Sequence, residues 1–472
     1  MKPAYLIPSM KEIEEVRATN GYKVISTFSG CGGACLGFEM DGYQILYANE
    51  FVEAARDTYA LNHPGVILDP RDIRTVTGED ILKQVGMSKG EIDVLEGSPP
   101  CASFSTAGSR EKAWGKVKQY SDTQQRADDL FFEYTRLVGE IQPKVFTAEN
   151  VSGLVKGKAI GYFKEIIREM RTHGYEVAAK VLDASYLGVP QARQRLIFVG
   201  VRQDLVDKYN VHPTFPKPLP YRYAIKEVIP IDGRVIHDTA GQFSVGDVTD
   251  RPVNTITTAN THWHIRENNS TIIIDPETGD DLRVQIKQDD DFIIIKRGSK
   301  AESRSISSED ILPTIAANGL SNVNASQAGV RLPMMDDPET GADLSVADCI
   351  THDLETGQDI RLDKYAIAPE WDKLAAGEQS TKYFQLVKPH PNKPIGTITA
   401  TAGGIGAAGS THPTQRRKFT LQELRTLSSF PADFILTGSY AQRWERIGRS
   451  VPPFMARAIA ETIRTEILDK TK

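Results

Sequence analysis

The feature that most constrains the fold is a strand, a glycine-rich turn and a helix near the beginning of the chain. The run Lys23–Phe28 predicts a buried strand, Ser29–Gly33 a sharp turn, and residues 34–40 the helix that follows. Glycines let the backbone turn sharply and let a ligand approach it closely. A second strand, Gln44–Ala48, ends in Asn49-Glu50. This alternation predicts an open α/β sheet.

Two acidic positions extend this pattern toward a cofactor. Glu50 lies about twenty residues after the glycine-rich turn, where dinucleotide-type folds hold ribose hydroxyls. Asp72-Ile73 follow the third candidate strand, from which an acid could reach an adenine amino group. The turn has no lysine and lacks the Walker spacing, which disfavours a nucleoside triphosphate. We therefore expect S-adenosylmethionine, the alternative for Glu50 being a solvated carboxylate at a strand end.

Composition excludes several classes of protein. The 472 residues, 40% hydrophobic and 25% charged, indicate a globular protein of two or three domains. We expect no signal peptide, no membrane span and a cytosolic location, because neither a leader nor a long apolar run is present. The four cysteines form no disulfide framework, and we expect no metal site. A net charge of −6 still permits a local basic cleft.

A single cysteine stands at the end of the next buried run. Ile92–Leu95 stops in Gly97-Ser98-Pro99-Pro100-Cys101, which fixes a thiol at the sheet edge where such folds bind ligands. By itself the thiol is more simply a small buried hydrophobe in a tight turn. The next strand, Pro143–Ala148, brings Glu149-Asn150-Val151 to the same edge. A nucleophile is therefore the second interpretation of Cys101.

Two further segments carry polar side chains suited to recognition. Gln191, Arg193 and Arg195 open a strand that continues through Leu196–Val201, and a period of two places them on one side. Such side chains suit a carboxylate, a phosphate or a base edge. Residues 102–121 are basic and contain Trp114. They predict either an ordinary surface loop or a flap that closes over a phosphate backbone.

The composition changes near residue 202. From there to about 392 short β-like runs replace the α/β alternation. Repeated turns at Asp275–Gly279, Asp337–Gly341 and Leu354–Gly357 predict successive hairpins. A Pro-then-Thr-Ile pattern also recurs, at Pro252–Thr257, Pro313–Ala316 and Pro394–Thr399. We therefore predict a catalytic domain over 1–201, a separate, mostly β domain over 202–392, and a return to the first domain over 393–472.

The helices and remaining strands of the α/β part follow from apolar spacing and capping signals. Capping boxes predict helix starts at Ser9 with Glu12 and at Thr420 with Glu423. The other predicted elements are helices at 128–141, 160–172 and 454–468 and strands at 175–182 and 196–201.

Taken in order, these motifs resemble those of the DNA cytosine-5 methyltransferases over residues 22–202 and 392–470. The matching motifs are Phe28–Gly33, Asn49-Glu50, Asp72-Ile73, Gly97–Cys101, Leu130–Phe132, Glu149–Val151, Gln191–Arg195 and Gly448–Pro453. The resemblance implies a Rossmann-like class I methyltransferase sheet, doubly wound, with a smaller, mostly β target-recognition domain at 202–392.

The resemblance also implies roles for single residues. Cys101 would attack C6 of a cytosine flipped from duplex DNA, and Glu149 would bind the ring N3. Arg195, with Arg193 beside it, would bind the cytosine O2. The positions that would line the S-adenosylmethionine site are Phe28, Gly30, Cys31, Gly32, Gly33, Glu50, Phe51, Asp72, Ile73, Ser98, Pro100, Leu130, Arg449, Ser450 and Val451. We expect a monomer associated with the nucleoid, in a restriction-modification setting.

Arg449 departs from the family pattern, which has Asn at this position of its last motif. A guanidinium near the methionine part of the donor requires an anion. Arg449 would either turn to solvent or pair with a nearby acid, or it would pair with a carboxylate on the donor itself. The second case implies carboxy-S-adenosylmethionine and transfer of a carboxymethyl group.

Other functions remain open at this point. A tRNA cytosine methyltransferase shares the catalytic motifs, although the long segment 202–392 favours readout of duplex DNA. A non-catalytic DNA-binding regulator would keep the fold without the chemistry, which the presence of Cys101, Glu149, Arg193 and Arg195 disfavours. The recognition sequence and the side chains that read it cannot be predicted.

Overall fold

The computed structural model describes residues 2–100, 130–155, 159–229, 231 and 350–472, together with the backbone of short strands within 118–125 and 235–306. The chain divides into two compact units. The sheet unit comprises Ile7–Tyr223, Pro394–Gly404 and Leu424–Lys472. The inserted unit comprises Met1–Leu6, Ala224–Lys393 and Ile405–Glu423.

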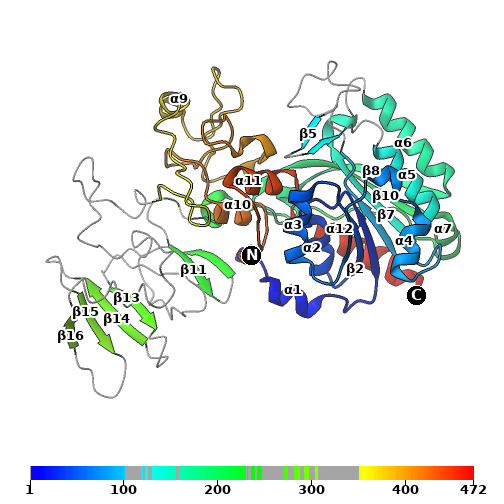
Figure 1. Cartoon of the computed structure of the whole chain (residues 1–472), viewed down its shortest axis with the longest axis horizontal. Helices are drawn as coiled ribbons and strands as arrows, with labels where there is room; N and C mark the ends of the chain where they lie inside the picture. Colours follow the sequence, from blue (N-terminus) through cyan, green and yellow to red (C-terminus); the bar gives the residue numbers. More distant parts are fainter. Residues whose placement is uncertain are drawn as a thin grey trace. The chain divides into compact units, whose positions relative to one another are not determined.

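A seven-stranded mixed sheet forms the centre of the sheet unit (Figure 1). Its strands, in spatial order, are β3 (Ile67–Asp69), β2 (Gln44–Asn49), β1 (Lys23–Thr27), β4 (Val94–Gly97), β7 (Val145–Val151), β10 (Gln194–Arg202) and β8 (Tyr175–Asp183). The first five are parallel, whereas β10 runs antiparallel to both of its neighbours. The predicted doubly wound α/β sheet is confirmed.

Helices cover both faces of this sheet, because successive side chains of a strand point to opposite faces and the central strands carry apolar side chains on both. Val24 and Val94 belong to one core, whereas Ile25 and Leu95 belong to the other. The first core packs against α2 (Gly33–Met40), α3 (Glu53–Asn62), α7 (Gln203–Tyr209) and α12 (Pro453–Glu466). The second packs against α4 (Gly78–Val85), α5 (Leu130–Ile141) and α6 (Ile160–Thr172). No helix among the described residues is long and apolar enough to cross a bilayer.

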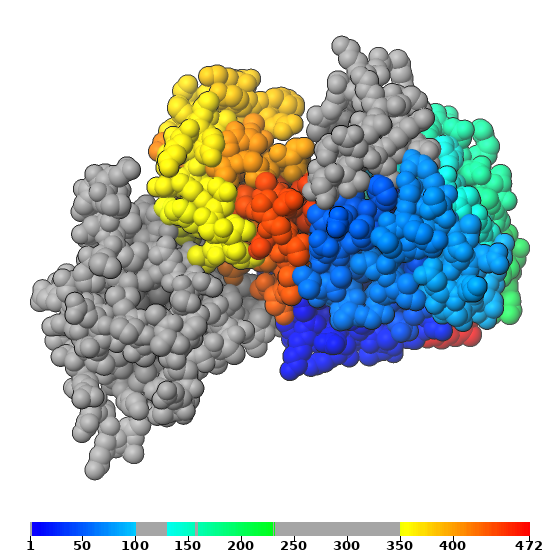
Figure 2. Space-filling view, viewed as in Figure 1, coloured from blue at the N-terminus to red at the C-terminus, as the bar shows by residue number. Residues whose placement is uncertain are grey.

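Helices α2 and α12 come from opposite ends of the chain and lie against each other on the first face. A β-carbon added at Gly37 of α2 would lie 2.5 Å from the Ala456 β-carbon of α12. Figure 2 shows the last residues, in red, against the blue surface of the first hundred. The glycine in α2 therefore permits the close approach of these two helices.

Local capping signals located several helices well. Helix α1 (Met10–Val16) begins after Ser9, whose side chain accepts from the Glu12 amide in the predicted capping box. The box of Thr420 and Glu423 is present at the start of α10 (Leu421–Leu427), and α6 has the predicted bounds. These signals act within one turn, so they do not depend on the remainder of the fold.

The boundaries of the two units differ from those predicted. Residues 202–223 belong to the sheet unit, because α7 and Val211 are buried in its first core. Residues 405–423 belong to the inserted unit. In both places the local sequence does not mark the boundary, because packing partners far away in the chain determine it.

The described part of the inserted unit contains β structure. Strands β11 (Val235–Thr239) and β12 (Gln242–Gly246) form a hairpin, and β13 (Ser270–Ile274), β14 (Asp281–Ile286), β15 (Phe292–Lys296) and β16 (Ser303–Ile306) form an antiparallel meander. The predicted turn Leu354–Gly357 lies between bridged residues His352 and Asp359, with Gly357 at φ +66°. Helix α9 (Ala368–Lys373) follows. The predicted turns 275–279 and 337–341 and the repeats at 252–257 and 313–316 lie outside the described residues.

Candidate active site

The carboxyl ends of five strands meet at one edge of the sheet. Thr27 of β1 pairs with Asn49 of β2 and with Gly97 of β4, and Gly97 pairs with Ala148 of β7. The segments that follow these strands therefore emerge side by side. They include the glycine-rich turn, Glu50, the turn at Ser98–Pro100 and Glu149.

The glycine-rich turn has the backbone that its sequence predicts. Phe28, Gly30 and Gly32 have φ values of +54°, +57° and +93°, so three left-handed residues lie within five positions. No atom lies within 4 Å of a β-carbon built on Gly30, which leaves open space beside the turn. The strained conformation of Phe28 is the kind found at ligand sites.

Glu50 closes this turn from the neighbouring strand. Its carboxylate accepts hydrogen bonds from the amides of Gly30, at 2.8 Å, and Val52, at 2.7 Å. Burial raises the pKa of Glu50, and these two amide bonds partly oppose the rise. The carboxylate retains free lone pairs beside the open space at Gly30. This arrangement fits the hydroxyl groups of a ribose.

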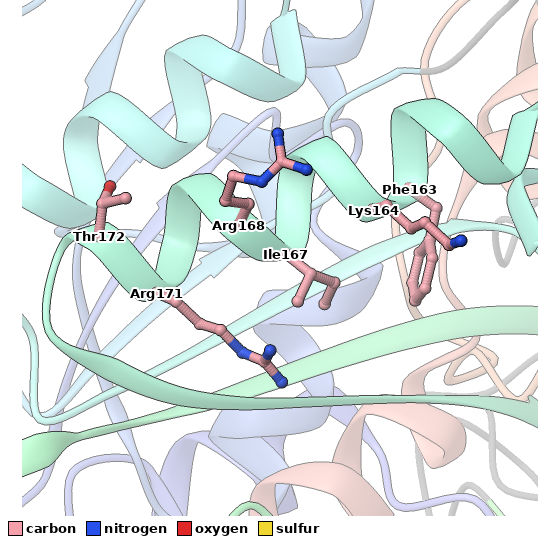
Figure 3. A pocket seen from close by; sticks show the side chains of 6 residues that line it. All are labelled: Phe163, Lys164, Ile167, Arg168, Arg171 and Thr172. Carbon is pink, nitrogen blue, oxygen red and sulfur yellow. The ribbon is translucent and has the colours of Figure 1, made fainter.

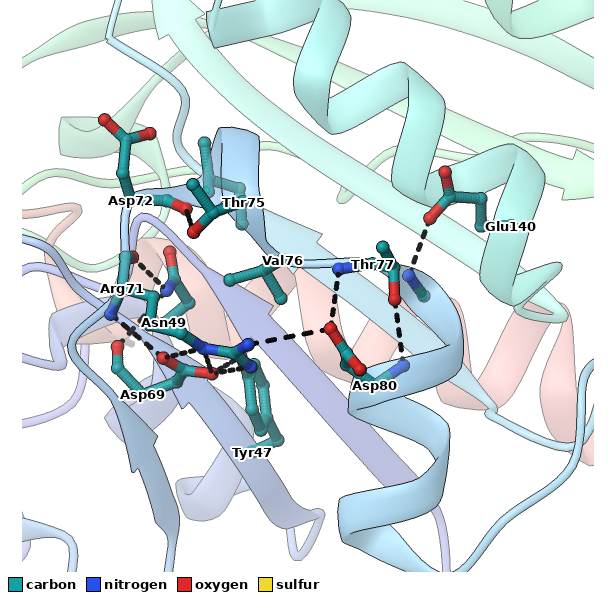
Figure 4. Close-up of polar contacts among 12 residues, drawn as sticks. Tyr47, Asn49, Asp69, Arg71, Asp72, Thr75, Val76, Thr77, Asp80 and Glu140 are labelled. Carbon is teal, nitrogen blue, oxygen red and sulfur yellow. Dashed lines mark hydrogen bonds and ion pairs between the residues drawn. The ribbon is translucent and has the colours of Figure 1, made fainter.

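The third strand presents two acids with different partners (Figure 4). Asp69 is buried and pairs with Arg71 at 2.7 Å, and it also accepts from the Tyr47 hydroxyl at 2.8 Å. Burial opposes ionisation of Asp69, but the bonds from Arg71 outweigh it and lower the pKa. Asp72 points away from this network and pairs with Arg74 at 3.0 Å, and the next residue, Ile73, is buried in the second core. Asp72 thus remains the accessible acid of the two.

The last motif packs directly on the glycine-rich turn. A β-carbon at Gly33 would lie 2.0 Å from Ser450 Oγ and 2.6 Å from the Val451 carbonyl oxygen. The thiol of Cys31 donates to the Arg446 carbonyl at 3.6 Å, and burial raises its pKa to about 11. Cys31 is therefore a thiol at neutral pH, which excludes it as a nucleophile. Residues predicted from both ends of the chain come together here.

The remaining predicted cofactor residues lie around the same edge. Leu130 is fully buried at the start of α5, and Phe51 directly follows Glu50, its carbonyl accepting from Arg56 at 2.6 Å. Gly32 lies over His63, whose Nε2 would be 2.1 Å from a β-carbon at that position. A side chain larger than hydrogen would not fit at position 32.

Three contacts hold the turn that leads into Cys101. The Ser98 amide donates to the Thr27 carbonyl at 3.3 Å, and its hydroxyl lies 3.4 Å from Glu96 Oε1. Asn150 Nδ2 donates to the Pro99 carbonyl at 3.1 Å. Cys101 itself, and the predicted flap at 102–121, lie outside the described residues apart from short strand traces. The position of residue 100 is thus fixed by β1, β4 and β7.

Glu149 and Arg195 are brought together as predicted from their motifs. Arg195 Nε lies 2.5 Å from Glu149 Oε1, although the contact lacks the alignment of a hydrogen bond. The two side chains are only 15% and 16% exposed. They come from adjacent antiparallel strands and face the same side of the sheet. A carboxyl and a guanidinium so placed suit a flat ring that carries both a nitrogen and a carbonyl oxygen.

Arg193 differs from its prediction, and so does Gln191. The predicted single strand is broken: β9 (Gln191–Ala192) pairs with β17 (Ile395–Gly396), and β10 begins only at Gln194. Arg193 is 2% exposed and donates to the carbonyls of Ile398 at 3.3 Å and Gly448 at 3.0 Å. Burial, and then Arg195, lower its pKa well below the usual value. Arg193 therefore holds backbone next to the last motif, and its charge interacts with that of Arg195.

Arg449 pairs with an acid of its own helix. Its guanidinium lies 2.7 Å from Glu445 Oε1, one turn earlier on α11 (Tyr440–Arg449), and its side chain is 41% exposed. The anion that this guanidinium requires is thus supplied by the protein. This is the simpler of the two expected arrangements.

Two residues at this edge were missed from the sequence. Asn150 was predicted only as a neighbour of Glu149, and no role was predicted for Glu96, which lies between the apolar run and Gly97. A carboxylate within a buried strand is itself a signal. A hollow along α6 is lined by Phe163, Lys164, Ile167, Arg168, Arg171 and Thr172 (Figure 3). Within the described ranges no three His, Cys, Asp or Glu side chains form a metal cluster.

The fold and the site together define the class of protein. A mixed sheet with the strand order given above, a glycine-rich turn closed by an acid, and a carboxyl–guanidinium pair at the carboxyl ends of the strands are features of a class I methyltransferase that acts on a base.

Comparison with known proteins identifies the family. The family of C-5 cytosine-specific DNA methylases matches residues 22–465, and the chain belongs to this family. The type II methyltransferase M.AgeI of Thalassovita gelatinovora is 26% identical over 94% of this chain and 100% of its own. M.DdeI of Desulfomicrobium norvegicum is 27% identical over 93% and 88%.

Other similarities are more local. The type II methyltransferase M.FnuDI of Fusobacterium nucleatum is 39% identical, but the match spans only 39% of this chain and about half, 48%, of that relative. A crystal structure described as a prophage-encoded DNA modification methyltransferase (E. coli) aligns with a TM-score of 0.53 and 18% identity over 95% of this chain and 99% of its own. The latter supports the fold alone.

Proposed function

We propose that this protein transfers a methyl group from S-adenosylmethionine to C5 of a cytosine flipped out of double-stranded DNA. The observation that supports it most is the Glu149–Arg195 pair, which lies at the sheet edge where the Ser98–Pro100 turn leads into Cys101. Full-length similarity to type II methyltransferases also favours a restriction-modification role in the cytoplasm, where DNA is accessible.

The chemistry requires these residue types at this edge. C5 of cytosine is a weak nucleophile until a group adds at C6, and the Cys101 thiolate would form that bond. Glu149 would bind N3 and Arg195 would bind O2 as electron density moves into the ring. After transfer a base removes the C5 proton, and the C6–sulfur bond breaks to release Cys101.

The described residues fit the methyl donor. S-adenosylmethionine supplies a methyl group on a positively charged sulfur. Glu50, with free lone pairs beside the open space at Gly30, would bind its ribose, and Asp72 would face its adenine. The backbone of Ser450 and Val451, packed on Gly33, would border its methionine part.

The family's usual donor is favoured over its carboxy derivative. The carboxymethyl alternative requires Arg449 to bind a second carboxylate, but Glu445 already pairs with this guanidinium at 2.7 Å. We therefore expect 5-methylcytosine as the product, in the wild type and in Arg449→Asn alike. Mass spectrometry of nucleosides from DNA of expressing cells would show carboxymethylcytosine if the alternative were correct.

Covalent trapping tests the catalytic roles. Duplex DNA with 5-fluorocytosine at the target position should form an adduct that survives denaturation, because fluorine cannot leave as the C5 proton does. Cys101→Ala should abolish the adduct, and Glu149→Gln or Arg195→Ala should slow it at least about 100-fold. Cys35→Ala is the matched control, since this thiol is buried on α2, where it accepts a hydrogen bond from the Tyr59 hydroxyl at 3.3 Å.

Trapping also separates the competing functions. A non-catalytic regulator would bind DNA without any adduct, and a tRNA enzyme would trap on tRNA and not on duplex DNA. Bisulfite sequencing of a plasmid from expressing cells would identify the recognition sequence. A plasmid without methylation in any sequence context would contradict the proposal.

A further inference from the structure

A buried carboxyl connects the turn before Cys101 to the glycine-rich turn. Glu96, on β4, is 5% exposed. Its Oε2 lies 2.6 Å from Ser26 Oγ on β1, and its Oε1 lies 3.4 Å from Ser98 Oγ. The Ser26 hydroxyl in turn lies 2.9 Å from that of Ser29, the first residue of the glycine-rich turn. One side chain thus bridges the two turns that carry the two reactants.

Strand register places Glu96 on the face that carries the catalytic pair. Ser26 pairs with Glu96, and Glu96 pairs with Thr147, so the three point to the same side. Glu149 is two residues beyond Thr147 and shares that side. From strand spacing, the β-carbons of Glu96 and Glu149 are about 8 Å apart. Glu149 is therefore an acidic neighbour of Glu96 on its own face.

The surroundings of Glu96 favour its neutral form. Burial raises its pKa to about 7, and Glu149 contributes to the rise, whereas the bonds with Ser26 and Ser98 oppose it. Among the described residues, other titratable groups that interact with Glu96 are Cys35 of α2, Tyr59 of α3 and Tyr134 of α5, none of which carries a positive charge.

A proton on Glu96 completes a directional chain of hydrogen bonds. Protonated Glu96 donates to Ser26, Ser26 donates to Ser29, and Ser29 donates to the Asn49 carbonyl at 3.3 Å. The Ser98 hydroxyl then donates to the second oxygen of Glu96. Loss of the proton reverses the bond to Ser26 and withdraws the Ser29 hydroxyl from Asn49, because each hydroxyl has one proton to donate.

We propose that Glu96 is a positioning residue for methyl transfer, which fixes the turn before Cys101 relative to the glycine-rich turn that would hold the donor. This inference rests on the proposed function. The thiolate and the methyl group act on adjacent ring atoms, C6 and C5, so a small shift between the two turns misaligns both reactions. The neutral carboxyl is the form that holds them.

Two variants at position 96 and one control test this role. In Glu96→Gln the amide donates to Ser26 and the carbonyl accepts from Ser98, so kcat at pH 6.5 should remain within about threefold of wild type. Glu96→Ala should lower kcat about 10- to 100-fold at saturating DNA and S-adenosylmethionine, with a smaller change in KM. Ser185→Ala is the control, because it removes a buried hydroxyl that bonds to Asp183 at 2.7 Å and takes no part in the hydrogen bonds around Glu96.

The pH profile is the readout that a purely structural role would not change. Wild-type kcat should contain a decline centred near pH 7 that Glu96→Gln lacks and Ser185→Ala keeps. A Glu96→Gln profile with the wild-type decline would overturn the inference, as would a Glu96→Ala enzyme with wild-type kcat. If Glu96→Ala does not fold, the Glu96→Gln profile still decides. A wild type that forms no adduct on 5-fluorocytosine DNA would instead contradict the proposed function.

Discussion

Folding makes the Glu96 carboxyl harder to ionise, and stability should therefore depend on pH through this residue. Its pKa is about 7 in the folded protein and near the ordinary 4.5 when unfolded. The folded state thus holds the proton between these values while the unfolded state releases it. As pH rises through this window, wild type should lose about 3 kcal/mol of unfolding free energy relative to Glu96→Gln.

Urea unfolding of both proteins at pH 4.5 and pH 8 measures this difference. Every other titrating group is present in both proteins, so their contributions cancel in the comparison. The unfolding free energy of Glu96→Gln minus that of wild type should be larger at pH 8 than at pH 4.5. A difference that does not change with pH would show that folding does not raise the pKa of Glu96.

At the level of single residues, the order of motifs in the sequence predicted which side chains meet at the site, but not all of their hydrogen-bond partners. The order of motifs brought Glu149 and Arg195 to one edge, because strand ends in such a sheet converge. It could not show that Arg193 bonds to the carbonyls of Ile398 and Gly448, which are more than 200 positions away. Glu445 as the partner of Arg449 was accessible to an i, i+4 rule that looks for opposite charges on a helix.

Among the elements, the contact between α2 and α12 depends on a glycine. A β-carbon at Gly37 would lie 2.5 Å from both the Ala456 β-carbon and the Pro453 carbonyl oxygen. Gly37→Ala should therefore lower the free energy of unfolding by about 1–3 kcal/mol, as overpacking does in other cores.

The matched control for Gly37 is Gly161, on the exposed side of α6. No atom lies within 4 Å of a β-carbon built there, so Gly161→Ala should stabilise the protein by up to about 1 kcal/mol through helix propensity. Chemical denaturation measures both. The prediction fails if the two substitutions change stability in the same direction.

Arg193, which follows β9 and bonds to the Gly448 carbonyl, should affect donor binding more than protein stability. Arg193→Met removes a buried charge, which is favourable, and takes this donor away from the carbonyls of Ile398, Gly448 and Arg449, which is unfavourable, so stability should change by about 1 kcal/mol or less. The segment at Gly448 would lose its anchor, and the Kd for S-adenosylmethionine should rise about tenfold.

Isothermal titration calorimetry and urea unfolding measure the two quantities. Arg202→Met is the control, because Arg202 also bonds two carbonyls, those of Gly90 at 3.0 Å and Gln142 at 2.7 Å, on the opposite end of β10. It should leave donor affinity unchanged. Equal effects of both substitutions on the Kd would contradict a specific role for Arg193.

The elements that sequence predicted best are those that local chemistry defines. The capping box at Ser9 and the apolar spacing of α6 need no distant partner. The antiparallel direction of β10 and the break at Arg193 depend on pairing with β7, β8 and β17, which a single sequence does not reveal. Pairing across long separations decides these features.

On the scale of the whole molecule, all the positions predicted to bind the cofactor belong to the sheet unit. Binding stabilises only the unit that holds the ligand, by about 2.7 kcal/mol at a concentration of 100 times the Kd. Scanning calorimetry of the full chain should therefore show S-adenosylmethionine raising the transition of the sheet unit. A single transition that shifts as a whole would show that the two units unfold together.

The contact of Cys31 with the Arg446 carbonyl joins residues 415 positions apart. A ribosome therefore makes the glycine-rich turn long before the segment that covers it. Until α12 is complete, the side of α2 around Gly37 lacks the helix that covers it, and chaperones would bind there on the growing chain. The cell would gain methyltransferase activity only after α12 has been synthesised. A chain interrupted before α12 would therefore leave the DNA of the cell unmodified.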